Sequence, residues 1–71
     1  MSEERDAERL AGTVRLLRRR LSLSQVQLAQ QAGLSRSTIA RIELGLANPD
    51  LATLSKLATA LDVSTSRLLK A

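Results

Sequence analysis

The sequence contains no cysteine, no histidine and no aromatic residue, and it has one proline and three glycines among 71 residues. Without cysteine there can be no disulfide, which suits a reducing cytoplasm, where we expect the chain to act. Cysteine and histidine supply most zinc ligands and nucleophile–base pairs, so we expect no metal, no cofactor and no enzymatic activity. Stacking of bases on aromatic side chains is excluded. No apolar run is long enough for a membrane span or signal-peptide core.

The net charge of +4 is unevenly distributed along the chain. Residues 1–9 carry a net charge of −2, whereas residues 10–71 carry +6. A basic small domain favours nucleic acid or another polyanion as its partner, although a solvated arginine-rich surface has the same composition. We expect no small-molecule ligand and no membrane partner.

Apolar residues recur with a helical period along most of the chain, and no period-2 run indicates a strand. The first helix is predicted to begin at Ala7. Its apolar face is predicted to consist of Leu10, Val14, Leu17 and Leu21. We expect residues 1–8 to be a flexible or frayed extension and residues 9–71 to form the folded domain. The alternative is that residues 1–6 are a loose extension of the first helix.

Four further helices each follow a residue whose side-chain oxygen can cap the first backbone N–H groups. These capping residues are Ser24, Ser35, Asp50 and Ser64. The helix after Asp50 is predicted to span Leu51–Leu61, and a short fifth helix follows Ser64. The sequence therefore predicts an all-α domain of five short helices.

The central stretch, residues 24–43, is predicted to form a helix, a tight turn and a second helix. Gly33 can end the first of these helices, because glycine adopts the left-handed conformation without a Cβ clash. Ala29 is expected where the two helices cross, so that a larger side chain there would push them apart. The shared apolar face is expected to contain Leu28, Ala32, Leu34, Ile39 and Ile42.

This stretch resembles the helix-turn-helix of phage repressors and Cro-like (XRE-type) regulators. The matching residues are Ser24-Gln25, Leu28-Ala29, Gly33-Leu34-Ser35, Ser37-Thr38-Ile39, Ile42-Glu43, Gly45, Pro49, Ala58, Leu61 and Val63-Ser64. The resemblance extends from about Val14 to Leu69. It implies a lambda-repressor-like, five-helix DNA-binding domain in which helices 2 and 3 form the helix-turn-helix.

The helix that begins at Arg36 is the candidate recognition helix. A helix fits the major groove of DNA, and arginine can pair with both acceptors of a guanine. We expect Arg36, Ser37 and Arg41 to contact bases, as the aligned residues do in the resembled repressors. Without the resemblance, two exposed arginines would be read as merely keeping a helix soluble.

A second group of residues is expected to contact the DNA backbone. The resemblance implies that Gln25 contacts a phosphate and buttresses the recognition helix, and that Arg18 pairs with Glu43 while also facing a phosphate. A neighbouring arginine could replace Arg18 in this pair. The expected backbone contacts are Ser24, Gln25, Ser35, Thr38, Arg18 and Asn48.

The chain departs from the resembled family after Glu43, where many relatives carry lysine, arginine or asparagine. Here Leu44 and Leu46 flank Gly45. An exposed apolar pair could contact a second protein, but we expect both leucines to pack on the fourth helix instead.

The sequence thus predicts a transcription regulator, of repressor or controller type, that binds double-stranded DNA sequence-specifically. It is expected to act as a homodimer on an inverted repeat. It would be either a free-standing regulator or a fragment of a larger repressor. Leu68 and Leu69 are the candidate dimer contacts, unless both close the core. The alternative is an antitoxin or co-regulator whose main partner is another protein.

Overall fold

The structure is a computed structural model that describes the backbone of residues 3–70 and the side chains of residues 5–70. Within this range the secondary structure is helical throughout and no strand is formed. The helices are α1 (Glu3–Arg20), α2 (Gln25–Ala32), α3 (Arg36–Glu43), α4 (Leu51–Ala60) and α5 (Thr65–Leu69). The predicted all-α, five-helix fold is confirmed.

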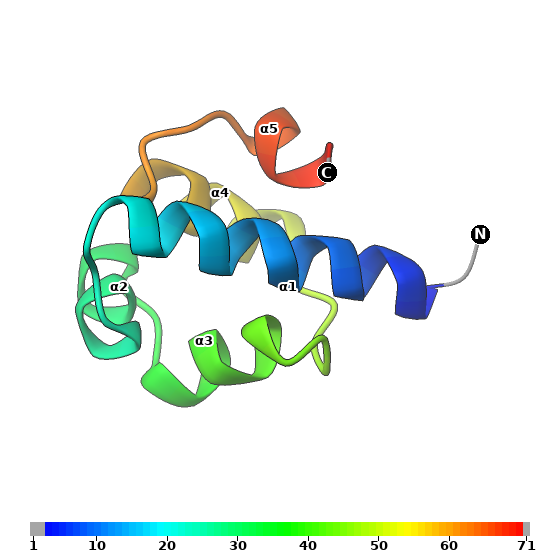
Figure 1. Ribbon diagram of the computed structural model, residues 1–71, viewed down its shortest axis with the longest axis horizontal. Helices are drawn as coiled ribbons and strands as arrows, with labels where there is room; N and C mark the ends of the chain where they lie inside the picture. The colour runs from blue at the N-terminus through cyan, green and yellow to red at the C-terminus, as the bar shows by residue number, and fades with distance from the viewer. Residues whose placement is uncertain (1–2, 71) are drawn as a thin grey trace.

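The helix α1 runs along the length of the molecule, and in Figure 1 α2 and α3 lie below it and α5 lies above it. It packs against α3 on one side and α5 on the other, while α2 contacts both α3 and α4. The helix-turn-helix pair α2–α3 is therefore supported from behind by α1 and α4.

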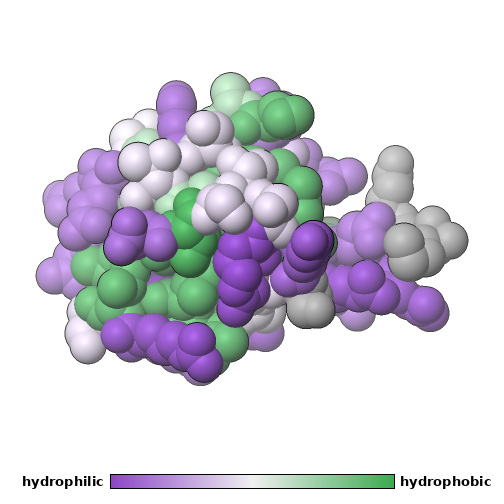
Figure 2. Space-filling view, turned by 90° about the horizontal axis from the view of Figure 1, so that it is seen from above, coloured by the Kyte–Doolittle hydropathy of each residue, from purple (hydrophilic) through white to green (hydrophobic). Residues whose placement is uncertain are grey.

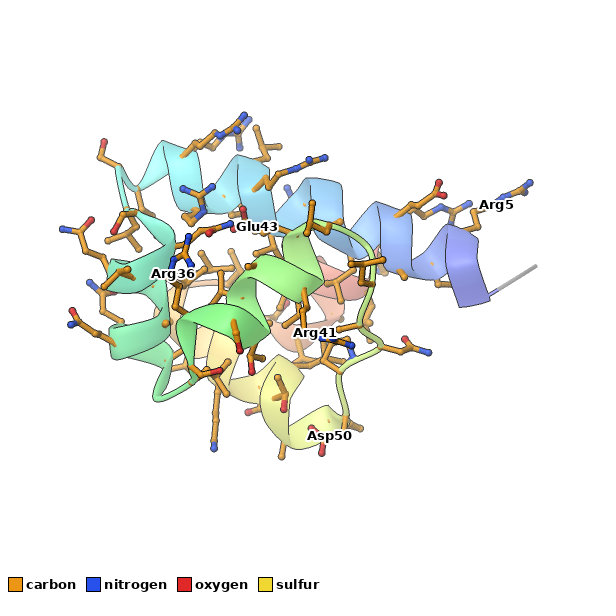
Figure 3. The ribbon with its side chains drawn as sticks, turned by 90° about the horizontal axis from the view of Figure 1, so that it is seen from below. Arg5, Arg36, Arg41, Glu43 and Asp50 are labelled. Atoms are coloured by element: carbon orange, nitrogen blue, oxygen red, sulfur yellow. The ribbon has the colours of Figure 1, made fainter. Side chains whose placement is uncertain are left out.

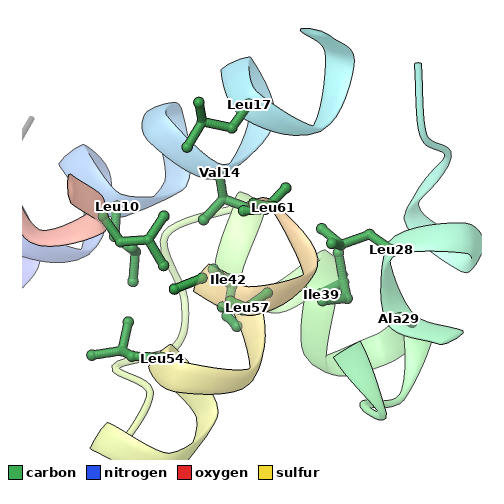
Figure 4. Close-up of a cluster of buried hydrophobic side chains, with 12 residues drawn as sticks. Leu10, Val14, Leu17, Leu28, Ala29, Ile39, Ile42, Leu54, Leu57 and Leu61 are labelled. Carbon is green, nitrogen blue, oxygen red and sulfur yellow. The ribbon is translucent and has the colours of Figure 1, made fainter. Parts of the chain in front are cut away.

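Twelve buried residues from all five helices and the α4–α5 turn form one core. Leu28, Ile39 and Leu57 have no exposed surface, and Figure 4 shows them among the side chains of α1 and α4. Burying such a side chain stabilises the fold by about 1.5–3 kcal/mol. Ala29 is 4% exposed on α2, which packs against α3, as predicted for the crossing point.

The predicted caps are all present. Ser24, Ser35, Asp50 and Ser64 each accept a hydrogen bond from the backbone N–H three residues later. At α2 the Gln27 side chain also accepts from the Ser24 N–H at 2.8 Å, so the predicted capping box forms. These caps satisfy N–H groups that have no partner within the helix.

The first four helices end in the same way, with a residue in the left-handed region followed by an apolar residue. The N–H of that apolar residue bonds back to a carbonyl in the last helical turn; Leu34 N donates to Ala29 O at 2.9 Å. This is the Schellman arrangement. The left-handed residues are Ser22, Gly33, Gly45 and Asp62.

Two predictions about individual positions are wrong, and they concern Leu21 and the pair Leu44 and Leu46. The helix α1 begins at Glu3, so residues 3–6 extend the first helix, which was one of the two expected alternatives. Ala7 is buried because α1 packs against α5 and lies close to Gly45. Whether the first turns fray stays a prediction, and residues 1–2 lie outside the described residues. Leu21 does not join the core: α1 ends at Arg20, and the turn leaves Leu21 46% exposed.

Leu44 and Leu46 are the second correction. They do not pack on α4 but are 69% and 65% exposed. Leu44 falls on the outer side of α3, whereas Leu46 follows the left-handed Gly45, and its N–H bonds back to the Arg41 carbonyl. Other apolar surface lies on the face opposite α3, where Figure 2 shows it bordered by hydrophilic side chains.

Candidate nucleic-acid interface

The two sides of α3 differ sharply in character. Ile39 and Ile42 are buried in the core, at 0% and 1% exposure. Arg36, Ser37 and Arg41 are exposed on the other side. Figure 3 looks onto this side of the molecule and labels both arginines on α3. The structure thus brings together on one helix face the three residues expected to contact bases.

The outer face of α3 carries uncompensated positive charge. Among residues 5–70, neither Arg36 nor Arg41 has an ion-pair or hydrogen-bond partner for its guanidinium group. The one acidic residue of α3 is Glu43, which is buried and 4% exposed. Both guanidinium groups are therefore free to bind a polyanion or a base edge.

Glu43 is held by two side chains from two other helices. Arg18 of α1 donates from Nε to Oε2 at 2.6 Å and from Nη2 to Oε1 at 2.9 Å. Gln25 at the start of α2 donates from Nε2 to Oε1 at 3.2 Å. The predicted ion pair is present, and its arginine is Arg18 rather than a neighbour. The network locks the end of α3 to α1 and α2.

The contact between Gln25 and Glu43 connects two residues that the sequence analysis treated separately. They are 18 positions apart, and only the fold brings them together. The Gln25 Nε2 atom faces Glu43, and Gln25 opens α2, where backbone N–H groups without helical partners can bind a phosphate. The structure thus fixes the orientation of the residue expected to contact the DNA backbone.

The network also changes the acidity of its members. Burial by itself would raise the pKa of the Glu43 carboxyl, but hydrogen bonds from Arg18 and Gln25 and the nearby positive charges outweigh it and lower the pKa. The hydrogen bond to Glu43 raises the pKa of the Arg18 guanidinium. Both groups are charged at neutral pH, so the pair adds no net charge.

The remaining residues expected to contact the DNA backbone differ in how much of their hydrogen-bonding capacity is already used within the protein. Arg18 also donates from Nη1 to the Leu23 carbonyl at 2.8 Å and its side chain is 12% exposed, so little of it is left for a phosphate. Ser24 serves as a cap, and Ser35 as a cap that also bonds the Thr38 hydroxyl at 2.8 Å. All three hydroxyl groups lie near the starts of α2 and α3.

Asn48 and the two C-terminal leucines lie elsewhere. Asn48 and Leu69 line a cavity of about 290 Å³ between the start of α1, the α3–α4 loop and α5. Leu68 is 1% exposed and belongs to the core, so its side chain is not available to a second protomer. Leu69 is 61% exposed and stays the candidate dimer contact.

The described part of the chain has neither a cluster of metal ligands nor a membrane-spanning helix. Within residues 5–70 no group of three acidic, histidine or cysteine side chains could hold a metal ion. None of the described helices is both long and apolar enough to cross a membrane.

Comparison with known proteins defines the class. The helix-turn-helix family HTH_3 matches residues 14–68. The chain therefore belongs to this family, the XRE-type helix-turn-helix proteins of transcription regulation, and it is not an enzyme. The predicted resemblance is confirmed.

Two curated relatives are longer than this chain. One is the immunity repressor protein of Bacillus phage phi105, 44% identical over 55 residues that make up 78% of this chain and 38% of the repressor. The other is an uncharacterized HTH-type transcriptional regulator, YonR, from the SPbeta prophage of Bacillus subtilis, 47% identical over 66% of this chain and 44% of YonR. The chain thus spans about two fifths of the length of these relatives.

Solved structures include relatives of similar size. The restriction-modification controller protein C.AhdI from Aeromonas hydrophila has a TM-score of 0.85 and is 40% identical, with 89% of this chain and 96% of C.AhdI covered. The hypothetical transcription factor NHTF from Neisseria has a TM-score of 0.88 and is 35% identical over 97% of this chain and 79% of its own. The fold of the five helices is thus shared across regulators of different length.

Proposed function

We propose that this chain is a transcription regulator that binds double-stranded DNA sequence-specifically, as a homodimer on an inverted repeat. One observation carries the proposal: Arg36 and Arg41 stand exposed on one face of α3 without partners for their guanidinium groups, beside the exposed Ser37, while Glu43 anchors the same helix to α1 and α2. A rigid helix that presents two free guanidinium groups is suited to pair with guanine O6 and N7 in the major groove.

In this arrangement α3 lies in the major groove and the start of α2 faces the phosphate backbone. Gln25 contacts a phosphate together with the free N–H groups at the N-terminus of α2. Ser24, Ser35 and Thr38 lie close enough to the same helix ends to add hydroxyl contacts. One α3 helix reads only a few base pairs, so a second protomer about one helical turn away, roughly 34 Å, supplies the second half-site.

The test is a selection from a random duplex library near physiological salt, followed by sequencing of the retained DNA. We expect an inverted repeat with guanines in each half-site. Arg36→Ala and Arg41→Ala should each relax the preference at one base pair, at a cost of about 1–3 kcal/mol. Gln25→Ala should weaken binding to all sequences alike. Wild-type base preferences in Arg36→Ala would refute the assignment of the recognition helix.

The dimer is tested separately by sedimentation velocity with and without the selected duplex. Leu69 is 61% exposed beside a cavity, which suits an apolar contact with a second copy. We expect Leu69→Glu to shift the protein towards monomer and to weaken binding to the full repeat more than to one half-site. Leu51→Glu is the control, because Leu51 is 69% exposed on a different helix.

A second candidate function is an antitoxin or co-regulator module with a protein as its main partner. The exposure of Leu44 and Leu46, at 69% and 65%, favours it. The selection separates the two candidates. If the selection enriches no DNA sequence motif and the protein binds only the DNA backbone, this result would support the protein-interaction module.

A further inference from the structure

Leu44 continues the outer face of α3 by one more position. Its N–H donates to the Ala40 carbonyl at 3.1 Å, and its φ and ψ of −91° and −2° are close to helical values. Residues four apart lie on the same face of a helix. Leu44 therefore stands in line with Ala40, one turn beyond Arg41 and two turns beyond Ser37.

Leu46 does not share this position. Gly45 has a φ of +73° and ends the helical path, and the Leu46 N–H bonds back to the Arg41 carbonyl. Of the two exposed leucines that follow Glu43, only Leu44 keeps the register of the outer face. Its side chain is 69% exposed and borders a cleft that Ala11 and Arg15 of α1 also line.

We propose that Leu44, together with Ala40, contacts the C5-methyl group of a thymine in the major groove and so determines base preference. This inference rests on the proposed function, because it assigns a residue within the same DNA-binding face. It adds an apolar contact to the guanine contacts of Arg36 and Arg41.

The chemistry of the groove supports this assignment. In the major groove the C5-methyl of thymine is the apolar group that base pairs present, and apolar side chains recognise it. Leucine has no hydrogen-bond donor in its side chain. Leu44 therefore cannot bind a phosphate, as a cationic or amide side chain at this position could. Leu44 lies eight positions after Arg36, a rise of about 12 Å along α3, so its contact falls on a different base pair from the one that Arg36 contacts. Free arginines on both sides of the apolar strip keep the helix close to the DNA.

The experiment removes the methyl group and nothing else. Starting from the selected duplex, each thymine is replaced in turn by deoxyuridine, and binding is measured by fluorescence anisotropy for the wild type and for Leu44→Ala. We expect one thymine in each half-site whose replacement weakens wild-type binding about fourfold. Burial of one methyl group accounts for an effect of this size. Leu44→Ala should be insensitive to the same replacement.

Leu16→Ala is the matched control, because Leu16 is also exposed, at 46%, but lies on α1. It should retain the full loss on uridine replacement. Wild-type binding that no uridine weakens, or an equal loss in Leu44→Ala, would overturn the inference while leaving the proposed function standing. A selection that enriches no DNA sequence would overturn both the inference and the proposed function.

Discussion

Arg18 and Glu43 form a two-point contact across 25 residues of sequence, with Nε 2.6 Å from Oε2 and Nη2 2.9 Å from Oε1. The two side chains are 12% and 4% exposed. A buried carboxylate is costly unless it is paired and hydrogen-bonded, and here both oxygens have partners. The pair therefore fixes α3 relative to α1 and removes the negative charge of Glu43 from the candidate interface.

Replacing Arg18 by alanine should destabilise the domain by about 3 kcal/mol, because it leaves the Glu43 carboxylate buried without its cation. Urea unfolding followed by circular dichroism measures the loss. Arg19→Ala is the control: Arg19 is exposed on the same helix, and its loss should change stability by less than about 0.5 kcal/mol. Equal effects of the two variants would show that the ion pair contributes nothing particular.

Stability should fall in acid through Glu43. Its pKa is lowered in the folded protein, so its contribution is present above the ordinary value of 4.5 and is lost as the pH falls through the folded value. The exposed Asp50 acts in the same direction, because its cap to the Thr53 N–H lowers its pKa from 3.8. Urea unfolding between pH 7 and pH 3 should give a shallower acid loss for Glu43→Gln than for the wild type. An unchanged acid slope in this variant would argue against the linkage.

Two glycines should respond to alanine with opposite signs. Gly33 has a φ of +68°, and no atom lies near the position that a Cβ would occupy. Gly33→Ala therefore introduces backbone strain alone and should lower the free energy of unfolding by about 1 kcal/mol. Gly12 lies within α1 and also has open space at Cβ, so Gly12→Ala should raise the free energy of unfolding by about 0.5–1 kcal/mol. Thermal and urea unfolding measure both, and the two changes must differ in sign for this account of Gly33 to hold.

Enlarging Ala29 should separate the two helices of the motif. Ala29 is a core residue, 4% exposed, on α2, which packs against α3, and added methylene groups in a packed core cost about 1–3 kcal/mol. Ala29→Leu should therefore unfold at lower urea and bind the selected duplex more weakly than the wild type does. Gln30→Leu, at an exposed neighbouring position, should do neither. Full DNA affinity in Ala29→Leu would show that the interface tolerates a shift of α3.

Most of the fold follows from local signals in the sequence. The caps at Ser24, Ser35, Asp50 and Ser64 depend on hydrogen bonds over three residues, so the residue pattern alone locates the starts of α2 to α5. The three residues expected to contact bases could be placed on one face because the apolar period of α3 defines its buried side.

The predictions from sequence failed where the surroundings of a residue depend on another part of the fold. The spacing of Leu21 fits the face of α1, but the helix ends before it. The exposure of Leu44 and Leu46 depends on where Gly45 directs the chain, and the Gln25–Glu43 hydrogen bond depends on the packing of α2 against α3. Residue patterns along one element do not contain such distant relationships. The resemblance predicted the Arg18–Glu43 pair and the support of α3 by Gln25, but not the Gln25–Glu43 hydrogen bond itself.

The repeated helix ending has a consequence for how fast the chain folds. The turns after the first four helices are closed by hydrogen bonds that span three to five residues, at Ser22, Gly33, Gly45 and Asp62. Short loops cost little closure entropy, and domains rich in local contacts fold within microseconds to milliseconds. A newly made copy should therefore hide its leucine-rich core soon after synthesis, before neighbouring copies can associate through it.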